Sequence, residues 1–171
     1  MQKKNIRLYN LLFPVWLLIW IPSWLWLVII PANYLIDYSV LFLSLTEDKQ
    51  HRKKLCHQLS WKICLAGFAA DLLGSLVLFG LLYTDTAEAP MWWQQLVRAL
   101  AWDLWHHAGA VGLTVAVIML VMILIYFFDR KILQVSLGIK QARRSALMLA
   151  VLTAPYFFLL STAWIYRLFG W

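Results

Sequence analysis

Residues 107–128 read HAGAVGLTVAVIMLVMILIYFF, a run of 22 positions without Asp, Glu, Lys or Arg. An α-helix rises about 1.5 Å per residue, so about 20 apolar residues cross the hydrocarbon core of a bilayer. Two further apolar runs of comparable length occupy residues 61–83 and 145–169. The sequence therefore predicts three membrane-spanning helices, over residues 61–83, 107–128 and 145–169.

The composition of the whole chain agrees with this prediction. Of its 171 residues, 63% are hydrophobic and only 13% are charged, whereas soluble domains are about half apolar and a quarter charged. These proportions argue against a soluble globular domain and against a disordered chain. We expect a single all-α, multi-pass membrane domain over residues 1–171, with no disulfide framework because the chain has only two cysteines.

The length of the first apolar stretch, Leu11–Leu45, does not decide how many times it crosses the membrane. It is long for one membrane span and short for two spans joined by a turn, and Pro14, Pro22 and Pro31 interrupt it. Two interpretations remain open at this point. One is a proline-broken hairpin or re-entrant segment over residues 8–46, and the other is one tilted span preceded by a short interfacial helix.

The distribution of basic residues favours the hairpin. Lys and Arg concentrate on the cytoplasmic side of membrane proteins. If residues 8–46 return to the side they entered, 13 of the 15 Lys and Arg residues lie on one side. A single crossing lowers that number to 10. We therefore expect a protein of the plasma or inner membrane with a cytoplasmic N-terminus and an outer C-terminus.

Two further patterns describe how such a bundle sits and packs. Residues 91–105 contain four tryptophans, which favour the headgroup region, so we expect an amphipathic helix there on the outer surface. Small residues at four-residue spacing let membrane helices approach closely, within one chain or between chains. They form three stripes: Ala66, Ala70 and Gly74; Ala108, Gly112 and Ala116; and Ala142, Ala146, Ala150 and Ala154.

The candidate site consists of acidic residues inside the apolar segments, Asp37 and Asp71. A carboxylate at that depth costs at least about 2.5–3.5 kcal/mol. Helix geometry places both about 14–15 Å from the cytoplasmic ends of their helices, and so at one level. They are candidates for sharing a proton or binding a cation. Asn33, Ser39 and Ser75 are candidates to add oxygen ligands or hydrogen-bond acceptors beside a broken segment.

Two other interpretations of these aspartates stay open. Each can simply hydrogen-bond a neighbouring helix and thereby hold the packing. The pair can also act as the aspartic dyad of an intramembrane enzyme, although the flanking glycine patterns of such proteases are missing. Phosphate-binding glycine loops and the GxSxG, HExxH and CxxC motifs are also missing from the sequence. We expect no cofactor, and an enzyme is not the favoured class.

A weak metal candidate lies near the outer surface. Asp103, His106 and His107 are neighbours on a helix, and carboxylate and imidazole groups suit zinc. Adjacent histidines point about 100° apart on a helix, so an interfacial cap is the favoured interpretation. The sequence therefore predicts no metal site.

Basic residues flank the first and last of the predicted spans. Beside a membrane, such clusters attract anionic headgroups or dock a cytoplasmic protein. The candidates are Arg52, Lys53, Lys54, Lys140, Arg143 and Arg144. Because membrane topology accounts for the basic residues, nucleic acid is not an expected partner.

Two functions of different classes follow from these observations. The first is a small transporter or channel with a proton or cation path through the intramembrane carboxyl groups. It is expected to be a homo-oligomer, since three or four short helices hardly enclose a pathway. The alternative is a non-catalytic membrane subunit that docks a cytoplasmic partner through the basic inner loops.

Overall fold

The computed structural model of the chain describes residues 26–46 and 48–169. These residues form helices and the turns that connect them, so the predicted all-helical class is confirmed for this part of the chain. In chain order the helices are α2 (Trp26–Ser44), α3 (Lys49–Leu82), α4 (Met91–Ala101), η1 (Leu104–His106), α5 (Ala108–Gln134), α6 (Ile139–Leu152), η2 (Tyr156–Leu159) and α7 (Thr162–Phe169).

Three of these helices, α2, α3 and α5, are long and apolar enough to cross a bilayer. The expected spans over 61–83 and 107–128 correspond to α3 and α5, and both helices extend further towards their basic flanks than expected. In their most apolar windows only 22%, 28% and 28% of the residues, respectively, are buried inside the protein. So much uncovered apolar surface is costly in water, and it suggests a membrane location.

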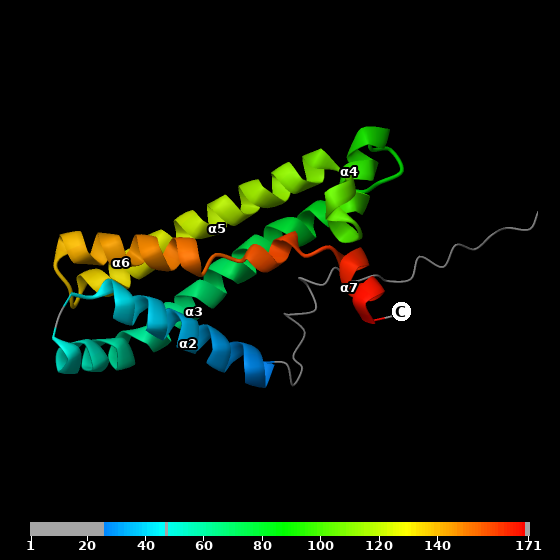
Figure 1. Cartoon of the computed structure of the whole chain (residues 1–171). Coiled ribbons are helices and arrows are strands. Elements are labelled where there is room, and N and C mark those ends of the chain that lie inside the picture. The colour runs from blue at the N-terminus through cyan, green and yellow to red at the C-terminus, as the bar shows by residue number, and fades with distance from the viewer. Residues whose placement is uncertain (1–25, 47, 170–171) are drawn as a thin grey trace, which may run out of the picture.

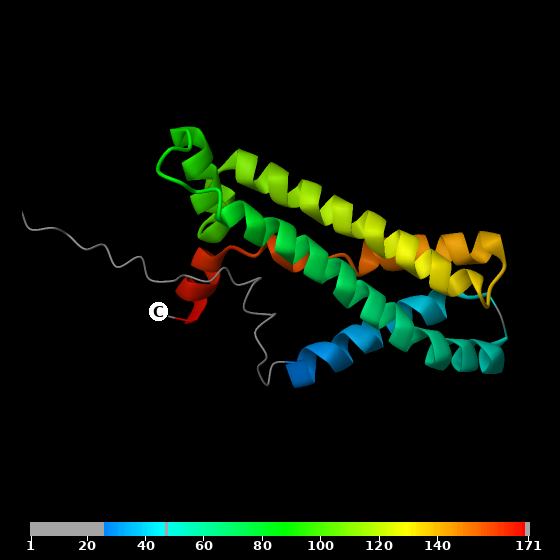
Figure 2. The same ribbon diagram turned by 180° about the vertical axis from the view of Figure 1, so that it is seen from behind.

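α3, α5 and α6 extend along the length of the molecule, and α2 crosses α3 at an angle (Figure 1 and Figure 2). α5 packs against both α3 and α6, while α2 contacts α3 and α6. We call one end of the molecule the basic end, where α2 and α5 finish and α3 and α6 begin. The opposite end, formed by α4, η1 and α7, is called the tryptophan end. It exposes Trp92, Trp102, Trp105 and Trp164.

The described part of the first apolar stretch is one uninterrupted helix. Pro31 lies inside α2, and the helix continues through it. Since proline removes one backbone donor, only the Leu27 carbonyl loses its usual helical partner. The expected break at Pro31 is therefore wrong. The remainder of the predicted hairpin over 8–46, with Pro14 and Pro22, lies outside the described residues.

The expected span over 145–169 is not a continuous helix. α6 already ends at Leu152, and two short helices follow it, η2 and α7. The reason is Pro155, which has no N–H to donate to the Val151 carbonyl and disfavours helical geometry in the residue before it. The Tyr156 hydroxyl donates to that carbonyl instead, at 2.5 Å. From this break the chain continues through η2 and a short connection to α7 at the tryptophan end (Figure 1).

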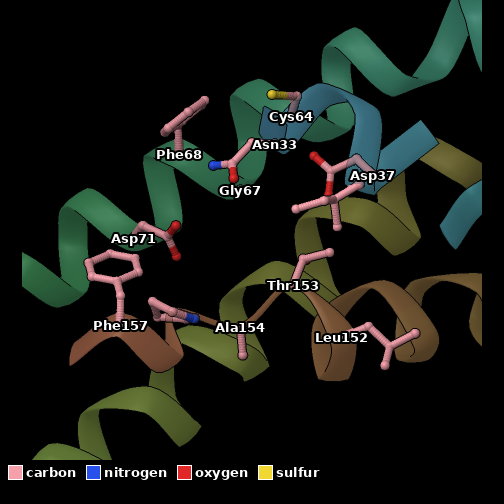
Figure 3. A pocket seen from close by; sticks show the side chains of 12 residues that line it. Asn33, Asp37, Cys64, Gly67, Phe68, Asp71, Leu152, Thr153, Ala154 and Phe157 are labelled. Atoms are coloured by element: carbon pink, nitrogen blue, oxygen red, sulfur yellow. The ribbon is translucent and has the colours of Figure 1, made fainter. Parts of the chain in front are cut away.

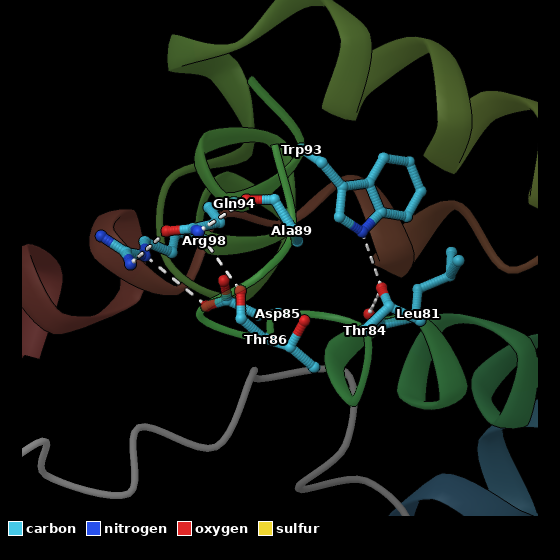
Figure 4. A network of polar contacts seen from close by, with 8 residues as sticks. All are labelled: Leu81, Thr84, Asp85, Thr86, Ala89, Trp93, Gln94 and Arg98. Atoms are coloured by element: carbon cyan, nitrogen blue, oxygen red, sulfur yellow. Dashed lines mark hydrogen bonds and ion pairs between the residues drawn. The ribbon is translucent and has the colours of Figure 1, made fainter. Parts of the chain in front are cut away.

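Residues 91–101 of the predicted helix over 91–105 are helical and form α4, while its place on the outer membrane surface stays a prediction. The last part of the predicted helix is wrong, because the chain turns after Ala101 and forms η1. A polar network holds α4 onto the preceding loop (Figure 4). Trp93 Nε1 donates to Thr84 Oγ1 at 2.9 Å, and Gln94 Nε2 donates to the Ala89 carbonyl at 2.9 Å.

Two of the three predicted small-residue stripes face the core. All four alanines of the α6 stripe are buried, as are Ala70 and Gly74 on α3. A Cβ on Gly74 would lie 2.4 Å from Val121 Cγ2, so glycine is needed for α3 to approach α5 this closely. The α5 stripe does not pack within this chain, since Ala108, Gly112 and Ala116 are exposed. α5 turns its larger side chains inward instead, and these include Val117, Val121 and Ile125.

Candidate functional site

A cavity of about 150 Å³ lies between α2, α3 and the turn that joins α6 to η2 (Figure 3). It has room for several water molecules. Its polar lining includes side chains from both α2 and α3. The full lining is Asn33, Ile36, Asp37, Cys64, Gly67, Phe68, Asp71, Leu152, Thr153, Ala154, Pro155 and Phe157.

Asp37 and Asp71 reach the cavity from different helices. Asn33 and Asp37 are four residues apart on α2 and share one face, as Gly67 and Asp71 do on α3. The side chains of Asn33, Asp37 and Asp71 turn towards the same space (Figure 3). Asp37 is 6% exposed and Asp71 is 8% exposed, so both carboxyl groups are shielded by the surrounding helices. The structure thus brings together the two acids that the sequence analysis placed at one level.

The third wall of the cavity is the break after α6. Thr153 caps the end of α6, since both its backbone nitrogen and its Oγ1 donate to the Leu149 carbonyl at 2.8 Å. Pro155 then turns the chain out of helical geometry beside the two aspartates. The expected break near Pro31 beside an intramembrane acid is not found, because α2 is continuous there. A different break, at Pro155, lies in the lining of the cavity with the two aspartates.

The cavity has no basic counter-charge within the described part of the chain, because its lining there contains no Lys, Arg or His. The Cys64 thiol hydrogen-bonds to Asp37, and Asp37 interacts electrostatically with Asp71. Asp71 Oδ1 is buried and finds no hydrogen-bond partner in that part of the chain. Two carboxyl groups that line one cavity without a cation favour the uptake of a proton or of a cation.

A third acid, Asp129 on α5, is a functional candidate that the sequence analysis missed. It is completely buried, and neither carboxyl oxygen has a hydrogen-bond partner among the described residues. Asp129 does not line the cavity, but the charge of Asp37 affects it as it affects Asp71. The neighbouring Arg130 and Lys131 made Asp129 resemble the start of a basic loop. The available signal was the four-residue spacing of Val117, Val121, Ile125, Asp129 and Leu133, which puts Asp129 on the core-facing side.

Two other predicted path residues lie outside the cavity lining. Ser75 is buried one turn beyond Asp71 on α3. Ser39 is exposed, and its hydroxyl donates to the Leu35 carbonyl of its own helix at 2.6 Å. The structure therefore separates Ser39 from the acidic cavity.

The three residues of the weak metal candidate have separate structural roles. His106 Nδ1 lies 2.8 Å from Asp103 Oδ2, and Ser161 Oγ donates to Asp103 Oδ1 at 3.1 Å. His107 caps α5 instead, since its Nδ1 accepts a hydrogen bond from Ala110 N at 3.3 Å. No group of His, Cys, Asp and Glu suited to a metal ion is found among the described residues.

The predicted basic residues gather at the basic end. Arg52 lies over the Phe42 ring, 4.6 Å from its centroid, and thereby ties α3 to α2. Unlike Arg52, the other five side chains are exposed: Lys53, Lys54, Lys140, Arg143 and Arg144. The basic residues lie in the first turns of α3 and α6 and not in loops. Both helices therefore begin earlier in the sequence than expected, and the loops before them are shorter.

Comparisons with protein-family models, with curated proteins and with solved structures give no match to this chain.

Proposed function

We propose that this chain is an integral membrane protein that moves protons across the bilayer through Asp71, Asp37 and Asp129. The observation that carries the proposal is the meeting of Asp37 and Asp71 in one shielded cavity without a basic residue in its described lining. Buried carboxyl groups in membrane helices are expensive, and chains of them serve as proton relays in pumps and transporters.

A proton suits this arrangement better than a metal ion. A metal ion is held by several oxygen ligands at once, and no group of His, Cys, Asp and Glu that could hold one is found among the described residues. Asp129 adds a carboxyl group on a third helix, and its oxygens have no partner among the described residues. In the proposed path, side-chain rotation and water molecules carry the proton from one carboxyl group to the next.

The proposed orientation follows the charge distribution. The exposed Lys and Arg side chains of the basic end favour a cytoplasmic position for that end. Self-association is part of the proposal, because so few helices hardly enclose a complete pathway. Size-exclusion chromatography with light scattering in detergent would measure the oligomeric state.

The test is proton flux into proteoliposomes that contain a pH-sensitive dye, driven by a potassium diffusion potential. We expect Asp37→Asn and Asp71→Asn to reduce the flux to that of protein-free vesicles. Asp48→Asn is the matched control, because Asp48 is exposed and its side chain makes no capping hydrogen bond to α3. Its flux should equal that of the wild type.

The opposite outcome is equally clear. If both cavity variants insert, elute like the wild type and retain its proton flux, the proposed path is wrong. Uptake of Na⁺ or K⁺ that depends on the aspartates, without proton flux, would replace the proton by a cation.

A second candidate is the non-catalytic membrane subunit that binds a cytoplasmic partner. The observation in its favour is the row of five exposed cations at the basic end. The same flux experiment separates the two functions, since a docking subunit gives no flux in any variant.

A further inference from the structure

A second hollow, independent of the acidic cavity, lies at the basic end between α3 and the end of α5. Its volume is about 320 Å³, the space of about ten water molecules. α3 contributes two of its lining residues, and the last turns of α5 with the residues after it contribute the others. They are Leu59, Lys62, Lys131, Ile132, Val135 and Ser136.

The cleft combines two kinds of surface. Lys62 and Lys131 bring two ammonium groups to it from two different helices, and Ser136 adds a hydroxyl. Leu59, Ile132 and Val135 supply apolar walls. No acidic side chain lines the cleft in the described part of the chain. Among the described residues, ion pairs are found only at the tryptophan end and in the loop before α4, so Lys62 and Lys131 take part in none of them.

This arrangement fits an amphipathic anion. A phosphate between the two lysines gains charge-assisted hydrogen bonds from both. The apolar walls, on helices long enough to span a membrane, accommodate the start of an acyl chain. A free inorganic anion would leave those walls unused, and a cleft of this size is too small for a protein helix with its side chains.

The position along the helices is also the one that a headgroup occupies. Trp61, next to Lys62, is 53% exposed, and indole rings favour the membrane–water interface. Lys131 directly follows the charged pair that ends the long apolar run of α5. Basic pockets between membrane helices on the cytoplasmic side bind phospholipid headgroups in this way.

We propose that the cleft between α3 and α5 binds the headgroup of an anionic phospholipid, with its phosphate between Lys62 and Lys131. This site does not depend on proton movement through the acidic cavity.

The experiment titrates the full-length protein, purified in a neutral detergent, with phosphatidylglycerol and counts bound lipid by native mass spectrometry. Phosphatidylcholine and inorganic phosphate are titrated in parallel. The wild type should retain phosphatidylglycerol in preference to phosphatidylcholine, and inorganic phosphate should not displace it. Displacement by inorganic phosphate at equal concentration would overturn the lipid assignment.

Two double variants locate the site. Lys62→Gln with Lys131→Gln should weaken phosphatidylglycerol binding about fivefold for each lysine, the effect expected for one cation at an anionic surface. Lys53→Gln with Lys54→Gln is the comparison, because these exposed lysines lie at the same end outside the cleft and attract a headgroup without enclosing it. Its binding should weaken clearly less than that of the cleft variant.

Equal weakening in the two double variants would mean that the whole basic end attracts lipid, and it would overturn the cleft proposal. Unchanged binding in the Lys62 and Lys131 variant would overturn it too. The thermal unfolding temperature without added lipid checks that each variant is folded, since the four replaced side chains are exposed.

Discussion

Asp103 and Asp129 are both largely shielded from solvent, but their surroundings are opposite. At the tryptophan end, the Asp103 carboxylate contacts Ser161, His106 and Arg167, and its side chain is 13% exposed. Inside the bundle, Asp129 is completely buried and has no hydrogen-bond partner among the described residues. The first carboxylate joins separate parts of the chain. The second makes no such contact among the described residues, and a buried polar group without a partner is costly, which is why we propose a functional role for it.

The largest effect on stability is expected for Asp103→Ala. The variant removes the carboxylate contacts to Ser161 and Arg167, while the Ser161 hydroxyl keeps the Trp102 carbonyl as an acceptor at 3.2 Å. Since hydrogen bonds to a charged group are lost, we expect a loss of about 1–3 kcal/mol. Thermal unfolding in detergent measures the loss, and limited proteolysis within residues 153–169 should become faster. His106→Ala is the control. Its side chain is 78% exposed, so its effect should be much smaller. Equal stability of Asp103→Ala and wild type would show that the contacts of the Asp103 carboxylate do not stabilise the fold.

Asp129→Leu should not lower the stability, in contrast to Asp103→Ala. Leucine has the same branched shape as aspartate, and replacing an unpartnered buried polar group is neutral or stabilising, by up to about 1 kcal/mol. The unfolding temperature should therefore stay constant or rise, while proton flux in the proteoliposome assay is lost. A fall in stability as large as that of Asp103→Ala would instead identify Asp129 as a structural, hydrogen-bonded residue.

The smallest effect is expected for Arg98→Gln. Arg98 Nε lies 3.5 Å from Asp85 Oδ2, but the arginine side chain is 62% exposed, so solvent screens the pair (Figure 4). The loss should be less than about 0.5 kcal/mol and should vanish in high salt. A loss comparable to that of Asp103→Ala would contradict the distinction between the shielded and the exposed carboxylate.

Some of the site was predictable from the sequence. Asp37 and Asp71 stand out because acids inside apolar runs are rare, and helix arithmetic placed them at one level. Asp129 was not predictable in the same way, since a basic pair follows it directly and it resembles a loop boundary. Its role depends on α5 continuing to Gln134, which hydropathy alone does not indicate. Likewise, a residue count along an apolar run says nothing about the break at Pro155.

The local pattern alone determined the helical class, the apolar character of the bundle and the gathering of charge near the ends of its helices. These properties depend on composition and on the rise per residue, so each segment carries them by itself. Which faces meet was decided by tertiary packing. α3 approaches α5 closely at Gly74, which buries the small-residue stripe of α3, whereas the stripe of α5 stays exposed. The turn at Pro155 came to lie against Asp37 and Asp71 because three distant segments pack together there, and no single segment encodes that contact.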